Sequence, residues 1–239
     1  MKMMQKSLLA LAVMATTALN VQAASNVDVK VIGRIDPGTC TPTLSGGGTI
    51  DYGTMSPSTL AATGFTVLPE KQLDFGITCT APSKVAVKVV NGRLGSAASL
   101  NAEGPTGFAN TNPVVTLLGT TGPKSIAGLG KVGTTNIGGY ALALNAAGAQ
   151  ADGVAVDTVL KREGAPVWAK PTTRDALLMD YAIARNVTWS EPGTLVPKAF
   201  TTLTGKLLVQ AFINERSALD LSNTILLDGL STLELVYLP

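Results

Sequence analysis

The sequence predicts an all-β fold, one β-sandwich with an elaborated middle segment. Charged residues make up only 14% of the 239 residues, and the mean hydropathy is +0.30. Short runs rich in Val, Leu and Thr are broken by Gly and Pro, a pattern typical of strands and turns rather than of long helices. Because no fixed-period repeat and no Pro/Ser-rich linker divides the chain, we expect a single domain.

The strands are predicted in order from alternating polarity. The first is Val27–Ile35, after which the sequence DPGT turns the chain toward Cys40. Thr49–Met55 is a short extended piece. Further segments with strand-like composition are Leu68–Cys79, Val85–Asn91, Asn112–Gly122, Gly138–Gly148, Gly153–Gly164, Phe200–Asn214 and Leu221–Pro239.

The middle of the chain is rich in Gly, Ala and Thr and is harder to interpret. The composition of Asp175–Arg185 permits a helix, but Tyr181 and Ile183 also alternate with small residues, which favours a strand.

Residues 1–23 are predicted to be a secretory signal peptide. Lys2 and Lys6 precede an apolar run, Leu8–Leu19, and the segment closes on small residues at Ala23. The run is too short to span a bilayer, so it fits a cleaved signal better than an anchor. We therefore expect secretion through the periplasm to the cell surface.

Cleavage is expected after Ala23 or Ala24, which leaves one mature domain, 24–239. The signal carries two Lys and no acid, so the 18 basic residues of the full chain become 16, against 16 acidic residues. A formally neutral chain has no basic field for nucleic acid. Neutrality is also unfavourable for the solubility of a free monomer, which hints at an assembly.

Cys40 and Cys79 are the two cysteines of the chain. An even pair in a secreted protein is predicted to form one disulfide. A metal site is not expected because the chain has no His, and the spacing of a redox CxxC pair is missing.

No catalytic set is found in the sequence, so we expect no enzyme and no cofactor. Catalysis by a Ser-His-Asp or Cys-His set requires His, which the chain lacks. Gly128–Gly133 matches GxGxxG, but no helix is predicted after it, so a turn is expected there. Asn186 begins a glycosylation sequon within a predicted strand.

Trp168 and Trp189 are the two tryptophans. They are candidate sugar-stacking residues, but in a chain with few aromatic residues we favour core anchors.

The C-terminal stretch Ser231–Pro239 alternates Leu233, Leu235 and Tyr237 with Thr232, Glu234 and Val236, as a half-buried strand does. Because the chain ends there, the sequence leaves open what pairs with this strand.

Several of these features together resemble a known family. Gly33 stands seven residues before Cys40, the second cysteine ends an alternating strand in Leu73–Val90, and the last strand carries the near-terminal Tyr237. The combination resembles the subunits of chaperone–usher fimbriae, and most closely a fimbria-associated family described as a domain of unknown function.

The resemblance implies an immunoglobulin-like, pilin-type sandwich that lacks its last strand. Its expected partners are a periplasmic fimbrial chaperone, an outer-membrane usher and neighbouring subunits, with a host glycan or surface receptor as a further ligand. The missing strand is then supplied by another polypeptide. Leu233, Leu235 and Tyr237 would line or flank the acceptor groove, and the disulfide would join the first two strands.

The sequence departs from the pilin pattern at both ends. The glycine closest to Tyr237 is Gly229, and the usual wider spacing falls on Leu226. If Val27–Ile35 is the first strand, a donor segment is limited to about Ala24–Asp28, which overlaps the start of that strand, and five residues span about 17 Å. Such a subunit would accept a strand without donating one, as expected at a fimbrial tip.

Two alternatives stay open. Val27, Val29 and Val31 alternate and are themselves a candidate donor strand. The chain is alternatively a free secreted β-sandwich that binds carbohydrate.

Overall fold

A computed structural model describes residues 29–33, 38–173 and 176–239, and residues 37–239 belong to one compact unit. The structure is all-β: the named strands pair antiparallel, and the helical turns of the described residues are three short 3-10 turns, Ser45–Gly48, Pro57–Thr59 and Arg216–Ala218. None of the helical turns in the described part of the chain is long and apolar enough to cross a bilayer.

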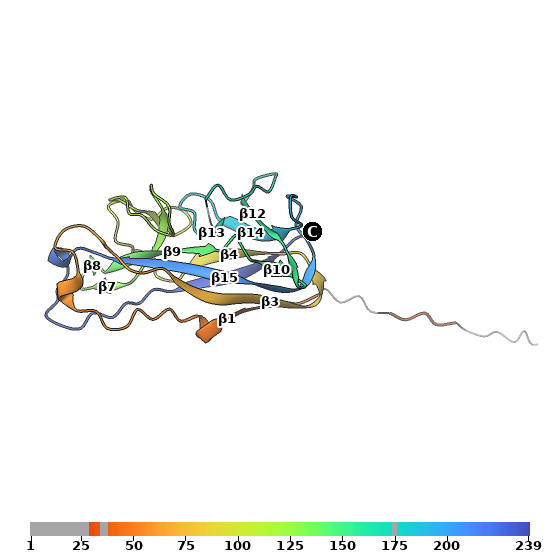
Figure 1. Ribbon diagram of the computed structural model, residues 1–239, viewed down its shortest axis with the longest axis horizontal. Helices are drawn as coiled ribbons and strands as arrows, with labels where there is room; N and C mark the ends of the chain where they lie inside the picture. The colour runs from red at the N-terminus through yellow and green to blue at the C-terminus, as the bar shows by residue number, and fades with distance from the viewer. Residues whose placement is uncertain (1–28, 34–37, 174–175) are drawn as a thin grey trace, which may run out of the picture. The chain divides into compact units, whose positions relative to one another are not determined.

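The larger sheet is built around the long strand β15 (Figure 1). Its main path runs β1 (Cys40–Leu44), β3 (Lys71–Ser83), β15 (Phe200–Ile213), β9 (Gly138–Leu144), β6 (Ser125–Gly128) and β5 (Ala109–Asn110). Short strands extend this path: β2 (Thr66–Val67) and β10 (Gln150–Ala151) pair with β15, β11 (Val154–Ala155) with β10, and β13 (Ala176–Leu177) with β9.

The smaller sheet has four strands, in the order β12 (Asp157–Arg162), β14 (Arg185–Ser190), β4 (Val85–Asn91) and β16 (Ser231–Tyr237). A separate hairpin joins β7 (Lys131–Val132) to β8 (Thr135–Asn136). The C-terminal strand β16 therefore lies at an edge, paired with β4 on one side.

The two sheets share one hydrophobic core. Phe75 and Ile77 of β3 face Val87 of β4 within it, as their alternation predicted. Trp189 of β14 is 1% exposed and packs between the rings of Phe75 and Phe200, with centroids 6.1 and 5.8 Å away.

A second apolar cluster covers the other face of the larger sheet. Leu208 and Phe212 of β15 are fully buried there, under Leu117, Leu118 and other residues of the middle segment. The elaborated middle is thus a third layer over β9 and β15.

The predicted disulfide is confirmed. Cys40 and Cys79 are bonded and are direct register partners in β1 and β3.

The predicted first strand is not found among the described residues. Residues 29–33 form no strand, and the first strand of the structure is β1, which begins at Cys40. Val29 and Val31 are 85% and 92% exposed. Val27 lies outside the described residues.

Two further predictions need correction. Most of Asn112–Gly122 is loop with one isolated bridge, since its apolar side chains pack on the outer face of the larger sheet. Asp180 interrupts the strand expected at 175–185: its Oδ1 accepts hydrogen bonds from the amides of Ala182 and Ile183, which bends the backbone.

Candidate functional site: a groove between the two sheets

An apolar groove of about 940 Å³ opens between the edges of the two sheets. One bank is the segment 44–60, which leaves β1, and the other is the segment 219–233, which leads into β16. The floor is the inner face of the larger sheet, where β15 contributes Leu207, Val209, Ala211 and Ile213.

Each bank carries a row of apolar side chains that pack on the core yet remain only partly buried. Core side chains such as Phe75, Val87 and Leu203 are by contrast almost completely buried. The two rows are Leu44, Ile50, Tyr52, Met55 and Leu60 on one bank, and Leu221, Ile225, Leu227 and Leu233 along the other.

Part of the backbone on the first bank, Ile50–Met55, has no sheet partners. Within the described part of the chain, no backbone–backbone hydrogen bond involves Ile50–Met55. The amide of Gly53 is instead bonded to Oδ1 of Asp51, at 2.7 Å. On the opposite bank the groove-side edge of β16 has no pairing strand among the described elements.

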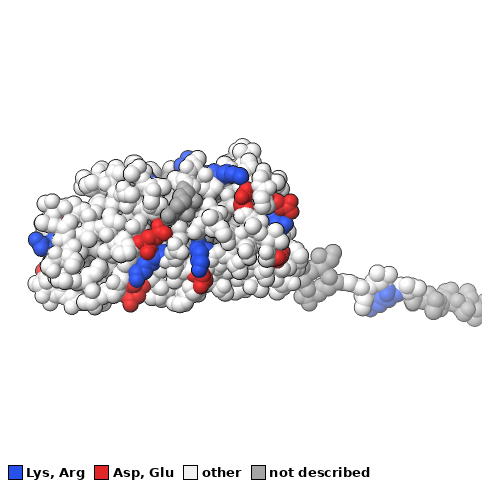
Figure 2. Space-filling model, viewed as in Figure 1, with Lys and Arg blue, Asp and Glu red and all other residues white. Residues whose placement is uncertain are grey.

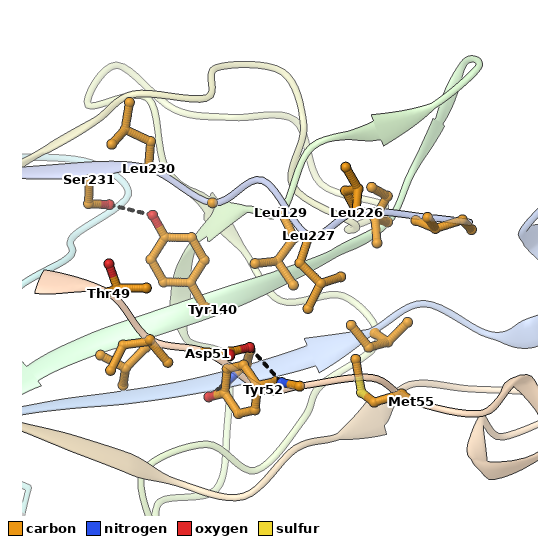
Figure 3. Close-up of a pocket in the computed structure, with 18 of the residues that line it drawn as sticks. Thr49, Asp51, Tyr52, Met55, Leu129, Tyr140, Leu226, Leu227, Leu230 and Ser231 are labelled. Carbon is orange, nitrogen blue, oxygen red and sulfur yellow. Dashed lines mark hydrogen bonds between the residues drawn. The ribbon is translucent and has the colours of Figure 1, made fainter. Parts of the chain in front are cut away.

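Tyr140 of β9 stands inside the groove (Figure 3). Its hydroxyl lies 2.6 Å from Oγ of Ser231, so the side chain joins the larger sheet to β16. Burial raises the pKa of Tyr140 to about 12, although the hydrogen bond with Ser231 acts in the opposite direction. The phenol is therefore neutral at physiological pH.

Tyr52, on the first bank, contacts the floor of the groove at Ala211, next to Tyr140. Its hydroxyl accepts a hydrogen bond from the amide of Ala211, at 3.2 Å, and Ala211 is the register partner of Tyr140. Burial raises the pKa of Tyr52 above its usual value.

Tyr237 ties the edges of the two sheets together. Its phenolic oxygen accepts a hydrogen bond from the amide of Cys40, at 2.7 Å. Since Cys40 begins β1 and Tyr237 ends β16, this bond joins two edge strands, the first and the last of the structure.

Of the predicted groove residues, Leu233 lines the groove. Leu235 and Tyr237 follow it in β16 beyond the lining residues, and Leu235 is half-buried against the core. Gly229 also lies on this bank, where a Cβ would come within 2.8 Å of Cε1 of Tyr140. Leu226 is 76% exposed.

The two tryptophans lie apart. Trp189 is enclosed in the core and presents no face to a ligand. Trp168 is half-buried, with Nζ of Lys161 5.0 Å from its ring centroid.

The first bank and the tyrosine inside the groove were missed by sequence reasoning. For the first bank, the sequence offers only the alternation of Ile50 and Tyr52 with polar residues within Thr49–Met55. Tyr140 cannot be distinguished in the sequence from the other residues of its apolar strand.

Among the described residues that line the groove, Asp51 is the one with a charged side chain. On the face shown in Figure 2, basic and acidic side chains lie close to one another on a mostly uncharged surface. In the described ranges, no group of three or more His, Cys, Asp or Glu residues is placed to hold a metal.

These features define a disulfide-bonded all-β protein with an open apolar groove between its sheets. A family model described as a protein of unknown function (DUF1120) matches residues 29–141. The chain is 32% identical to Protein GltF of Escherichia coli (strain K12) over 250 residues, covering 95% of both chains. It is 28% identical to the uncharacterized protein YhcF of the same organism over 228 residues, 92% of this chain and 94% of that protein.

The chain belongs to this DUF1120 family.

Proposed function

We propose that this protein is a structural or adhesive subunit of a bacterial surface fimbria whose groove accepts a β-strand from another polypeptide. The fold is then an immunoglobulin-like, pilin-type sandwich that is one strand short. The supporting observation is the groove itself. Half-buried apolar side chains line both of its banks, and the backbone of Ile50–Met55 on one bank has no sheet partner.

A β-strand suits this groove better than a compact small molecule does. An added strand donates and accepts main-chain hydrogen bonds along both banks, and its alternate side chains enter the apolar interior. It would bond to Ile50–Met55 on one side and to β16 on the other. It would also cover edges that otherwise invite aggregation.

The partners in this proposal act in sequence. A periplasmic chaperone fills the groove first, and a neighbouring subunit replaces it at the outer-membrane usher. The protein then reaches the cell surface as part of the fimbria, where a host glycan or receptor is a further candidate ligand.

The start of β1 at Cys40 changes the argument about donation. With cleavage after Ala23, the residues from Ala24 to Thr39 precede β1, which is 16 residues rather than five. Sixteen residues span up to about 50 Å when extended. The segment with Val27, Val29 and Val31 is therefore long enough to donate, and a short N-terminus no longer favours the tip.

The proposal is tested by producing residues 24–239 in the periplasm with and without a chaperone of the chaperone–usher class. We expect aggregation or proteolysis of the lone chain, and a soluble one-to-one complex when the chaperone is present. A lone chain that is soluble, monomeric and cooperatively folded to high temperature would support the free carbohydrate-binding sandwich instead.

Two variants of one strand locate the binding site. Leu233→Asp places a charge on the groove bank and should abolish recovery of the complex. Thr232→Asp is the matched control, because Thr232 is exposed and is the adjacent residue of β16. Equal recovery of both variants would contradict the groove assignment.

A further inference from the structure

The first bank of the groove carries a methionine, Met55, whose sulfur can be reached from solvent. Met55 is only partly buried against the core and lines the groove. The end of its side chain points from the first bank into the groove in Figure 3. It closes the segment Ile50–Met55, whose backbone makes no backbone–backbone hydrogen bond within the described part of the chain. The thioether is therefore open to small molecules as long as the groove is unfilled.

The other sulfur atoms of the expected mature chain are protected. Residues 24–239 contain two methionines, Met55 and Met179, and the two cysteines. Met179 is 3% exposed and belongs to the hydrophobic core. Cys40 and Cys79 are joined in the disulfide. Met55 thus carries the one thioether of this chain that an oxidant in solution reaches without unfolding the protein.

Peroxides oxidise an accessible thioether to a sulfoxide. The sulfur of Met55 would attack one oxygen of hydrogen peroxide, so that an S–O bond forms and the O–O bond breaks. The products are methionine sulfoxide and one molecule of water: the sulfur loses two electrons and the peroxide gains them. A flexible apolar side chain is thereby replaced by a polar one that accepts hydrogen bonds.

This change would fall where the proposed strand binds. Ile50–Met55 is the backbone with which an added strand would pair, and apolar side chains line both banks beside it. A sulfoxide oxygen covered by the strand would exchange its hydrogen bonds to water for apolar surroundings, which is unfavourable. Conversely, a strand that is already in place would cover the thioether and exclude peroxide from it.

Resting on the proposed function, we infer that Met55 is an oxidation site that regulates the groove. Peroxide converts Met55 to the sulfoxide only while the groove is unfilled, and the sulfoxide then weakens strand binding. A subunit whose groove is filled is protected. The oxidant therefore acts on the assembly of subunits and not on subunits that are already joined.

The first measurement compares the oxidation rates of the two methionines. The mature chain is refolded, kept dilute and treated with hydrogen peroxide, either alone or with a saturating excess of a labelled peptide of residues 24–36. Mass spectrometry of the digested protein follows the sulfoxide at Met55 and at Met179. In the chain alone, we expect Met55 to react at least about tenfold faster than Met179 because only Met55 is accessible.

The peptide should slow the reaction of Met55 about tenfold and leave Met179 unchanged. Met179 is the internal control, since a peptide that merely stabilised the fold would slow both methionines. Equal rates for Met55 and Met179 in the chain alone would show that the thioether is not accessible, and the inference would be wrong.

The second measurement tests the effect on strand binding by fluorescence anisotropy of the labelled peptide. Oxidation of the wild-type chain should weaken binding about tenfold. Met55→Leu removes the sulfur at nearly constant volume. It should bind as the untreated wild type does and keep its affinity after the same peroxide treatment. Met55→Gln places a polar group at the same position and should bind weakly without any oxidant.

The outcomes separate the inference from the proposed function. If the untreated chain binds the peptide and the oxidised chain binds it equally well, Met55 does not regulate the groove, although the groove accepts strands. The same conclusion follows if peroxide weakens Met55→Leu as much as the wild type. If the untreated chain binds no peptide, and Met55 reacts equally fast with and without it, the inference falls together with the assignment of the groove as an acceptor for this segment.

Discussion

At the scale of residues, Tyr237 and Cys40 show how a single hydrogen bond joins the last strand of the structure to the first. The amide of Cys40 is available to Tyr237 because β1 pairs with β3 on its other side. The bond fixes the distance between two edge strands that no other strand joins among the described elements.

We predict that Tyr237→Phe lowers the free energy of unfolding by about 0.5–1.5 kcal/mol, the usual value of one hydrogen bond. Tyr237 is 52% exposed, so water can replace the lost partner and the lower part of the range is expected. Urea unfolding of both proteins under identical conditions measures the difference.

The control is Tyr181→Phe, a change at a tyrosine that is 36% exposed and lies away from the groove. It should alter stability by less than about 0.5 kcal/mol. Equal effects of the two substitutions would show that the bond between Tyr237 and Cys40 contributes nothing measurable.

A second cluster of residues holds the middle segment in place. Asp180 is 4% exposed, and its Oδ2 accepts hydrogen bonds from Arg162 and Arg185, at 2.8 and 2.7 Å. Burial alone would raise the pKa of Asp180. The bonds from Arg162 and from the amides of Ala182 and Ile183, together with the charge of Arg185, outweigh burial and lower it.

We predict that Asp180 makes stability depend on pH in the acid range. Its folded pKa is depressed, so its contribution is complete above the unfolded value of about 4 and is lost as the pH falls through the lower folded value. Asp180→Asn should therefore cost about 1.5–3 kcal/mol at pH 7 and much less near pH 3. Unfolding titrations at both pH values test this.

Glu234→Gln is the matched control for charge. Glu234 pairs with Lys88 at 3.3 Å on the surface, and its side chain is 48% exposed. The expected change is at most about 1 kcal/mol at pH 7. If the cost of Asp180→Asn is the same at pH 3 and pH 7, the charged interactions of Asp180 are not what stabilises the segment.

At the scale of elements, strands that face the core were predictable and irregular segments were not. Alternation in Leu68–Cys79 located β3, and alternation in Phe200–Asn214 located β15 and its inward face. The pattern is local to each strand, so one chain is enough to read it.

The groove could be predicted only in part, because it depends on an irregular segment and on contacts between residues far apart in the sequence. Its C-terminal bank is a regular strand, and Leu233 was expected there. The other bank is an irregular segment at 44–60, and Tyr140 gains its role from Ser231, 91 residues away in the sequence. No periodicity within either segment encodes that contact.

The start of the first strand was missed because Val27–Ile35 alternates as well as any strand in the chain. Alternation shows which side chains of a strand share a face. It does not show whether the pairing strand belongs to the same polypeptide or to another one. The alternation of Val27, Val29 and Val31 that suggested a first strand also fits a strand that pairs with another molecule.

The disulfide links two neighbouring strands at this end of the sheet. Removing it as Cys40→Ala with Cys79→Ala should cost about 4 kcal/mol, because the bridge closes a loop of 39 residues in the unfolded chain. Alanine is chosen because Cys79 is buried, and serine would add a hydroxyl to the core. Chemical unfolding measures the cost.

The wild-type protein treated with reductant provides the independent comparison. Reduction should destabilise it to the level of the double variant and leave the variant unchanged. A variant as stable as the oxidised wild type would contradict the predicted contribution of the bridge.

At the scale of the whole molecule, the expected mature chain has no net charge, 16 basic against 16 acidic residues, and an unfilled groove. Net charge near zero favours association, and open strand edges favour it further. A segment that carries exposed Val29 and Val31 precedes the compact unit that begins at Pro37. The same chain therefore has both a groove and a candidate strand for it.

If this segment fills the groove of a second copy, the mature chain should form multimers whose length rises with concentration. Deleting residues 24–36 removes the donor but leaves the unit from Pro37 onward with its groove. The deletion variant should then stay monomeric and, mixed with the mature chain, should shorten its multimers. The deletion variant would accept a strand from the mature chain but could not donate one to a further copy, so each multimer would end there. Light scattering after gel filtration measures the length distribution.

Substitutions within the segment test whether its side chains, and not only its length, are required for the multimers. Val29→Asp with Val31→Asp places charges on the side of the segment that would enter the groove, and burial of such charges is costly. This variant should behave like the deletion. Lys30→Asp changes the intervening position, which would face away from the groove, and should leave the multimers intact. Identical distributions for all four proteins, or a mature chain that remains monomeric at every concentration, would show that copies of this chain do not complete one another and that the strand comes from a different polypeptide.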